Sequence, residues 1–177
     1  MGILLGFAPF IGFTLLTGIS VSLALWVAFG AAFAIGIRDF LHTKILRTLD
    51  VGCLALFALL ALYAGFVQPN LTVQAVRLIA DAGLLVIALG SIAMGNPFTL
   101  QYARDLAPES LWHEPRFIRA NYILTGVWAL AFFVMALADA IATFDKRFPF
   151  SLDVAAGLFV LVLAIVATVR YPSRITR

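Results

Sequence analysis

Residues 1–37 read MGILLGFAPFIGFTLLTGISVSLALWVAFGAAFAIGI and contain no charged side chain. As a single helix they would extend about 56 Å at 1.5 Å per residue, which is nearly twice the hydrocarbon thickness of a bilayer. The stretch is therefore expected to fold back on itself. Gly18 favours the end of a helix and Ser20 favours the start of the next, so residues 17–20 are predicted to form the break.

The composition of the whole chain places it in a membrane. Of its 177 residues, 63% are hydrophobic and 12% are charged, against about 25% charged in an ordinary soluble domain. A mean hydropathy of +1.06 excludes a soluble fold, and the abundant aromatic residues exclude a disordered chain. The net charge of +3 comes from basic residues that are spread along the chain, so no nucleic-acid partner is expected.

Charge-free runs and turn residues predict six membrane helices. Gln68-Pro69-Asn70 and residues 147–151 supply two further breaks. The expected fold class is an all-α polytopic membrane protein, a single transmembrane domain over residues 1–177, built as three consecutive hairpins. A five-span arrangement with one long, tilted first helix remains an alternative. The predicted helices cover residues 3–17, 20–37, 49–67, 72–95, 118–143 and 151–171.

The distribution of lysine and arginine predicts the orientation. Nine of the twelve basic residues fall on one side of a six-span model, and the opposite side holds only Lys146 and Arg147. Both termini and the two longer loops are therefore expected to be cytoplasmic. The nine residues are Arg38, Lys44, Arg47, Arg104, Arg116, Arg119, Arg170, Arg174 and Arg177.

Ionisable groups inside these helices are the first candidate site, because each costs at least about 2.5 kcal/mol at a helix centre. Arg77 and Asp81 lie one turn apart on the helix 72–95, and Asp139 lies near the outer end of the helix 118–143. They could bind a lipid head group or relay a proton; alternatively, Arg77 and Asp81 form only a structural salt bridge. The ligand-binding or proton-relay candidates are Gln74, Arg77, Asp81, Asn121 and Asp139.

Asn121 and Asp139 belong to a polar and aromatic stripe on the helix 118–143. The other members are Thr125, Trp128 and Phe132, at spacings that place all five on one face.

The polar and aromatic segment that follows the helix 72–95 is the second candidate. It could dock a partner protein or form a catalytic cap; alternatively, it rests in the lipid head groups as an amphipathic segment. The docking candidates are Asn96, Pro97, Phe98, Gln101, Tyr102 and Arg104.

Known catalytic and cofactor motifs do not occur in the sequence. His42 and His113 both lie in predicted loops, so no pair of membrane histidines can hold a haem, and Cys53 is the single cysteine. There is no HExxH, GxSxG or P-loop pattern. An enzyme is therefore not favoured, and no cofactor or metal is expected.

Several short motifs resemble those of the bacterial intracellular septation protein A-like family of inner-membrane proteins. They are Phe7-Ala8-Pro9-Phe10, Pro97-Phe98, Phe117-Ile118-Arg119-Ala120-Asn121, Trp128-Ala129 and Phe132-Phe133. The resemblance extends to the length and the six-span layout, although the basic loop after the second helix is less basic here than in the family. It implies a multi-pass protein of the bacterial inner membrane that acts in septation, cell division or envelope maintenance through protein contacts.

Two other functions stay open at this stage. The chain could be a small transport or lipid-binding protein that uses the buried charges, or an accessory subunit of a larger membrane complex. The expected partners are the lipid bilayer, membrane proteins of the envelope machinery, and a second copy of the chain.

Overall fold

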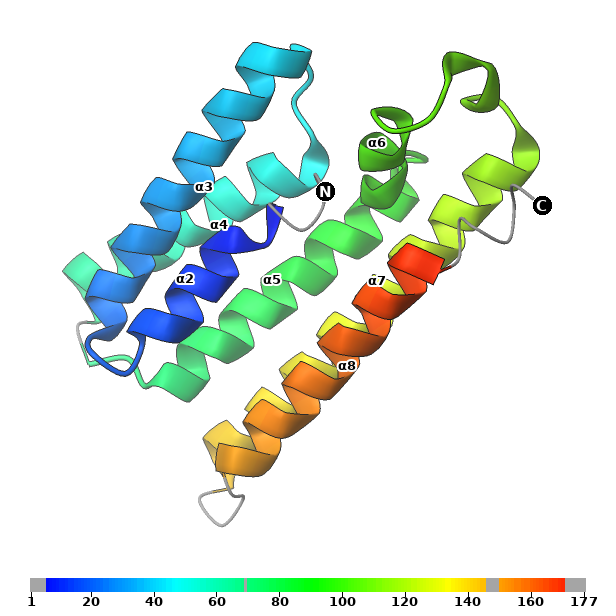
Figure 1. Ribbon diagram of the computed structural model, residues 1–177. Coiled ribbons are helices and arrows are strands. Elements are labelled where there is room, and N and C mark those ends of the chain that lie inside the picture. The colour runs from blue at the N-terminus through cyan, green and yellow to red at the C-terminus, as the bar shows by residue number, and fades with distance from the viewer. Residues whose placement is uncertain (1–5, 69, 146–149, 171–177) are drawn as a thin grey trace. The chain divides into compact units, whose positions relative to one another are not determined.

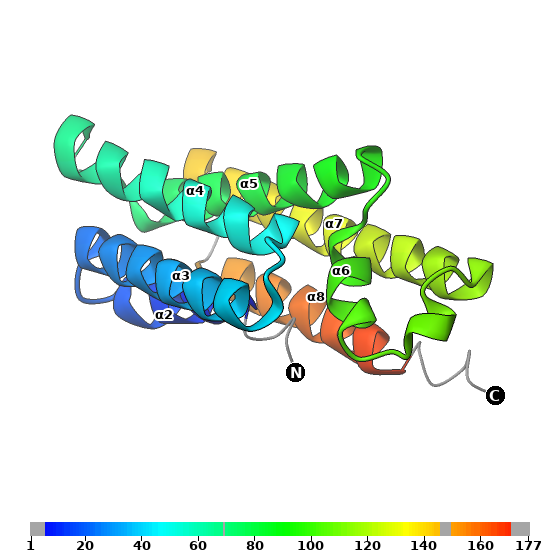
Figure 2. The same cartoon turned by 90° about the horizontal axis from the view of Figure 1, so that it is seen from above.

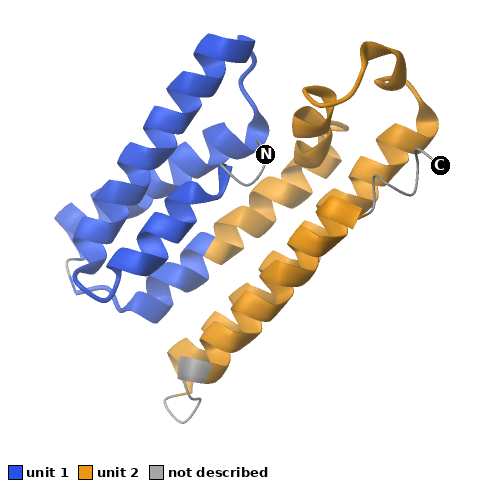
Figure 3. Cartoon of the chain, viewed as in Figure 1, with its two compact units in different colours: residues 1–80 blue, residues 81–177 orange. Residues whose placement is uncertain are grey.

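The computed structural model describes residues 6–68, 70–145 and 150–170. Every regular element in these ranges is a helix, as the sequence predicts. Five of the described helices are long and apolar enough to cross a membrane, which is the pattern of a multi-pass membrane protein. The chain divides into two compact units, residues 1–80 and residues 81–177 (Figure 3).

Unit 1 is a set of antiparallel helices joined by short turns (Figure 1). It contains α2 (Ala8–Leu16), α3 (Val21–Thr43), α4 (Thr48–Leu62), the π-helical turn η1 (Tyr63–Val67) and the beginning of α5 (Val73–Ala93). Helix α3 packs against both α2 and α4. The interior of the unit is apolar and includes Phe13, Leu25, Ala28, Phe57 and Val76.

The predicted break at residues 17–20 is confirmed. Helix α2 ends at Leu16 and α3 begins at Val21, with Ser20 in an extended conformation at the N-cap. The Ser20 hydroxyl accepts a hydrogen bond from the Leu23 backbone N–H at 3.4 Å, as a capping serine does. The described residues 6–37 therefore do not form the single tilted helix of the five-span alternative.

The described part of the first predicted helix is short. Helix α2 has nine residues and extends about 14 Å at 1.5 Å per residue, which is less than one bilayer crossing. The start of the predicted helix 3–17 lies outside the described residues. The five described helices that can cross a membrane are Val21–Thr43, Thr48–Val67, Val73–Ala93, Pro115–Phe144 and Leu152–Arg170.

The prediction that the second helix ends at residue 37 is wrong, because α3 continues to Thr43. No proline or glycine interrupts residues 38–43, and the carboxylate of Asp39 is neutralised by two arginines. The helix ends where Lys44 adopts a left-handed conformation with φ of 56°. Arg38 and His42 consequently lie on the helix and not in a loop.

The second predicted break is also confirmed. Turn η1 ends at Val67, and α5 begins at Val73 after Thr72, whose hydroxyl accepts a hydrogen bond from the Ala75 N–H at 3.2 Å. Pro69, which motivated the prediction, lies outside the described residues.

Unit 2 contains the rest of α5, a short helix and a long helical hairpin. Helix α6 (Phe98–Arg104) is followed by the 3-10 turn η2 (Glu109–Leu111), then by α7 (Pro115–Phe144) and α8 (Phe150–Arg170). Helices α7 and α8 run antiparallel and side by side (Figures 1 and 2). The Trp128 indole N–H donates to the Thr168 hydroxyl at 2.9 Å and sets the register of this pair.

The polar segment after α5 was not predicted to be helical, yet it contains α6. Helix α7 also begins at Pro115, three residues before the predicted start at 118, because proline is well tolerated in the first turn of a helix.

Candidate functional site

The chain leaves α5 through a sharp turn that brings α6 back toward the helices of unit 2. Gly95 has a φ of +73°, a conformation that a residue with a side chain rarely adopts. The Ser91 hydroxyl accepts a hydrogen bond from the Phe98 N–H at 3.1 Å and donates one to the Ala88 carbonyl at 2.7 Å. This buried serine therefore joins the end of α5 to the start of α6.

Helix α6 is attached to α7 through buried hydroxyl groups. The Thr99 hydroxyl lies 2.8 Å from the Asn121 carbonyl oxygen and 2.8 Å from the Thr125 hydroxyl. The Thr99 N–H also donates to Thr125 Oγ1 at 3.4 Å. Both threonines are buried, so these polar groups would be unsatisfied if α6 moved away from α7.

Replacing Thr99 with valine is expected to loosen α6 without unfolding the helical hairpin. Valine has a similar shape but leaves the Thr125 hydroxyl without this partner, which costs about 1–3 kcal/mol. Hydrogen exchange of the α6 backbone amides should become faster in Thr99→Val and stay near the wild-type rate in the control Thr99→Ser, which keeps the hydroxyl. Equal protection of α6 in wild type and Thr99→Val would contradict this attachment.

The segment between α6 and α7 is held by hydrogen bonds of one tryptophan, Trp112. The Trp112 indole N–H donates to the backbone carbonyls of Arg104 and Ala107, each at 3.1 Å. One side chain thereby holds together the end of α6 and the loop that follows it.

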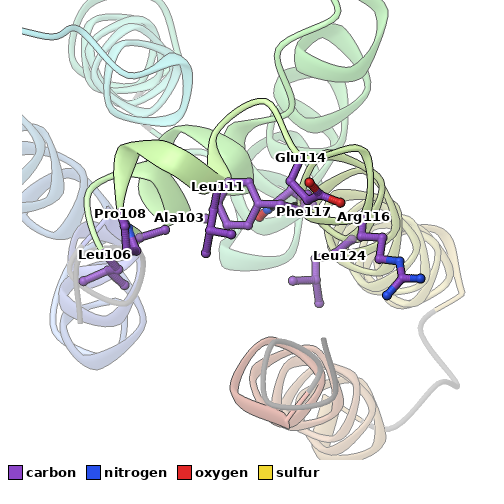
Figure 4. Close-up of a pocket in the computed structure, with 11 residues that line it drawn as sticks. Ala103, Leu106, Pro108, Leu111, Glu114, Arg116, Phe117 and Leu124 are labelled. Carbon is purple, nitrogen blue, oxygen red and sulfur yellow. Dashed lines mark hydrogen bonds between the residues drawn. The ribbon is translucent and has the colours of Figure 1, made fainter. Parts of the chain in front are cut away.

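A pocket of about 580 Å³ lies between this returning segment and the first turns of α7 (Figure 4). We call it the unit 2 pocket. Among the residues that line the pocket, Leu106 and Pro108 lie at one end, and Glu114 and Arg116 lie toward the other end. The lining residues are Ala103, Leu106, Ala107, Pro108, Leu111, Glu114, Arg116, Phe117, Ala120, Asn121 and Leu124.

The walls of the unit 2 pocket are mainly apolar, and its charged groups are at its edge. Glu114 and Arg116 are exposed, whereas Asn121 and Leu124 are buried. Over residues 104–119 three acidic and three basic residues give no net formal charge. The pocket is therefore suited to an amphipathic molecule whose head group is uncharged or zwitterionic.

Unit 1 holds a group of charges, buried except for Arg38, that we call the ion cluster: Arg38, Asp39, Arg47 and Asp50. Arg47 Nη1 lies 2.5 Å from Asp39 Oδ2 and 3.7 Å from Asp50 Oδ2. Arg38 Nη2 lies 2.6 Å from Asp39 Oδ1, but the Arg38 side chain is 48% exposed. Two carboxylates and one buried guanidinium thus lie at the end of α3 and the start of α4.

The stripe predicted on the helix 118–143 is the buried face of α7. All five of its members are buried. Of the predicted ligand-binding residues, Asn121 lies in the unit 2 pocket, where its side-chain amide donates to the Phe117 carbonyl at 2.9 Å. Asp139 lies further along α7 and is fully buried.

The other predicted ligand-binding residues lie on α5. Asp81 is buried, and Arg77 and Gln74 are partly buried. Their association with each other and with Asp139 in one site stays a prediction.

The predicted docking residues differ in exposure. Pro97, Phe98, Gln101 and Tyr102 are buried, Arg104 is partly buried, and Asn96 is exposed. A docking role for them stays a prediction.

Sequence reasoning missed both the ion cluster and the unit 2 pocket. The signal for the cluster was present, since opposite charges at positions 38, 39, 47 and 50 flank a predicted helix end. The pocket had no comparable signal, because its shape depends on how the Trp112 side chain folds the preceding loop.

Models of protein families, curated proteins and solved structures contain no match to this chain. Within the described residues, no group of three or more His, Cys, Asp and Glu side chains is placed to hold a metal ion.

Proposed function

We propose that this chain is a multi-pass membrane protein that binds an amphipathic molecule, such as a zwitterionic lipid, in the unit 2 pocket. The observation that carries the proposal is the pocket itself, about 580 Å³ with leucine and phenylalanine walls and a charged edge. Small-molecule sites in proteins have volumes of about 300–1,000 Å³ and the same mixture of apolar walls and few polar groups. This function corresponds to the lipid-binding alternative drawn from the sequence, but Asn121 is the one residue that the two sites share.

The test is the binding of a fluorescent lysophosphatidylcholine to the purified chain in detergent. Leu106 is 74% exposed and lines the pocket, so Leu106→Glu places a charge on its wall with little effect on folding. We expect this variant to bind about tenfold more weakly, since the apolar part of a bound lipid would cover this charge and remove it from water. The matched control is Leu130→Glu, at a 63% exposed leucine of α7 outside the pocket.

Equal affinities of the wild-type chain and Leu106→Glu would contradict the proposed function. A second variant, Leu124→Trp, fills the buried end of the pocket and should also weaken binding while Leu130→Trp does not.

The motif resemblance supports a second proposal, a role in septation or envelope maintenance at the bacterial inner membrane. One of its motifs, Phe7-Ala8-Pro9-Phe10, lies at the start of α2. The ring centroid of Phe10 lies 4.6 Å from that of Phe57 on α4. Cells that lack the protein should then form long filaments, and a fluorescent fusion should gather at the division site. Normal cell length together with uniform membrane fluorescence would contradict this role.

We further propose that the basic loops face the cytoplasm. Seven of the nine basic residues assigned to that side are described, and they flank the ends of the helices that can cross a membrane. On a Cys53→Ala background, Ser110→Cys should react with a membrane-impermeant maleimide only after the cell is opened. Asn70 lies in the turn between η1 and α5, on the side opposite to the basic loops, so Asn70→Cys should react in intact spheroplasts. The reverse pattern of labelling would contradict the proposed orientation.

A further inference from the structure

Unit 1 has a groove of its own between α3, α4 and the loop that joins them, which we call the unit 1 groove. It has a volume of about 160 Å³. Gly36 is on its wall, and a side chain added there would enter open space. The lining residues are Phe33, Gly36, Ile37, Phe40, Ile45, Leu46, Arg47, Asp50, Val51 and Leu54.

The polar residues of the unit 1 groove, Arg47 and Asp50, form ion pairs within the protein. Arg47 contacts both Asp39 and Asp50, as described for the ion cluster, and its side chain is only 6% exposed. Its charge is therefore balanced internally, and the remaining surface of the groove is apolar.

Lys44 supplies a cation at the edge of the same groove. Its left-handed conformation ends α3, and its ammonium nitrogen lies 5.7 Å from the ring centroid of Phe40, which lines the groove. Lys44 is exposed, and no carboxylate of the described residues forms an ion pair with it. Between residues 38 and 50 three basic and two acidic side chains give a formal charge of +1.

We propose that the unit 1 groove binds an anionic phospholipid, with part of one acyl chain in the groove and the phosphate at Lys44. An apolar cavity of about 150 Å³ holds one benzene-sized group, so this groove fits a short length of chain and not a whole lipid. Basic residues beside a membrane helix attract anionic lipids by about 1 kcal/mol each. The net positive charge distinguishes this groove from the unit 2 pocket, whose surrounding charges cancel.

The test compares spin-labelled phosphatidylglycerol with spin-labelled phosphatidylcholine in phosphatidylcholine vesicles that contain the full chain. The fraction of immobilised label gives the relative association of the two lipids. We expect the wild-type chain to prefer phosphatidylglycerol. Lys44→Gln should lower this preference about fivefold, which corresponds to the loss of one basic residue near the surface, and Lys44→Arg should retain it.

Gly36→Leu tests the acyl-chain part of the proposal, because its side chain enters the groove. The preference for phosphatidylglycerol should fall in this variant and persist in the control Gly30→Leu, at an exposed glycine of α3 that does not line the groove. Circular dichroism melting of both variants shows whether they are folded. The unit 2 variant Leu106→Glu should keep the lipid preference, which separates this inference from the proposed function.

Equal association of both lipids with the wild-type chain would overturn the proposal, as would an unchanged preference in Lys44→Gln and Gly36→Leu. Inorganic phosphate, compared with chloride at equal ionic strength, should not remove the preference. Its removal by phosphate would identify a site for the free ion and would also overturn the lipid assignment.

Discussion

Replacing Arg47 with leucine is expected to lower the free energy of unfolding by about 3–5 kcal/mol, since the change removes the one buried guanidinium that lies beside both Asp39 and Asp50. Asp39 and Asp50 are 7% and 9% exposed, so water replaces the guanidinium poorly. The effect is to be measured as thermal or denaturant unfolding of the purified chain in detergent.

Two further variants show whether this loss comes from the ion pair. The double variant Asp39→Leu with Arg47→Leu should be more stable than Arg47→Leu alone, because fewer uncompensated charges remain buried. Arg38→Leu removes a half-exposed arginine from the same Asp39 and should cost no more than about 1 kcal/mol. Equal losses in Arg47→Leu and Arg38→Leu would contradict the assignment of Arg47 as the buried member of the cluster.

Trp128→Ala is expected to destabilise the α7–α8 hairpin by about 3–5 kcal/mol, the usual range for truncating a buried aromatic side chain. Trp128 is fully buried, its ring centroid lies 5.7 Å from that of Phe132, and its indole N–H bonds to Thr168. The alanine variant leaves a cavity in place of this side chain, and unfolding in detergent measures the loss.

The contributions of the Trp128 hydrogen bond and of its packing to the stability of the hairpin can be measured separately. Thr168→Val removes the acceptor and keeps the shape, so it should cost only about 1–3 kcal/mol through the indole N–H that loses its partner. Trp128→Phe should fall between Thr168→Val and Trp128→Ala. A Trp128→Ala protein as stable as the wild type would show that this residue does not hold α7 and α8 together.

The breaks between helices were predictable from the sequence because their signals are local. Ser20 caps α3 through its own hydroxyl, and the glycine and proline residues near each break disfavour continued helix. The apolar runs between the breaks likewise predicted the long helices to within a few residues, except at the end of α3.

The end of α3 and the presence of α6 depend on contacts that local patterns do not contain. The charges of Arg38 and Asp39 favour a loop in a sequence-based prediction. In the structure, however, the Arg47 guanidinium, eight positions further along the chain, donates a hydrogen bond to the Asp39 carboxylate across the turn. Helix α6 is held by Thr99, whose partners Asn121 and Thr125 are 22 and 26 positions away. Neither pairing is visible in the hydropathy of the segment.

The candidate site was predictable only in part for the same reason. The spacing along α7 placed Asn121 on one polar and aromatic face, and the structure shows that this face is buried. The spacing gave no indication that the loop after α6 leaves an apolar pocket beside Asn121, because the pocket depends on the two hydrogen bonds of the Trp112 indole.

The most direct test of the proposed function is photo-crosslinking of the full chain in native membranes with a diazirine-bearing phosphatidylcholine, followed by peptide mapping. Crosslinks should concentrate in residues 103–124 and should be lost from this range in Leu106→Glu. The contrary result is labelling spread evenly over exposed apolar residues such as Leu158 and Phe159 of α8, with no change in the variant. That pattern would mean that the lipid only surrounds the helices and does not occupy the unit 2 pocket.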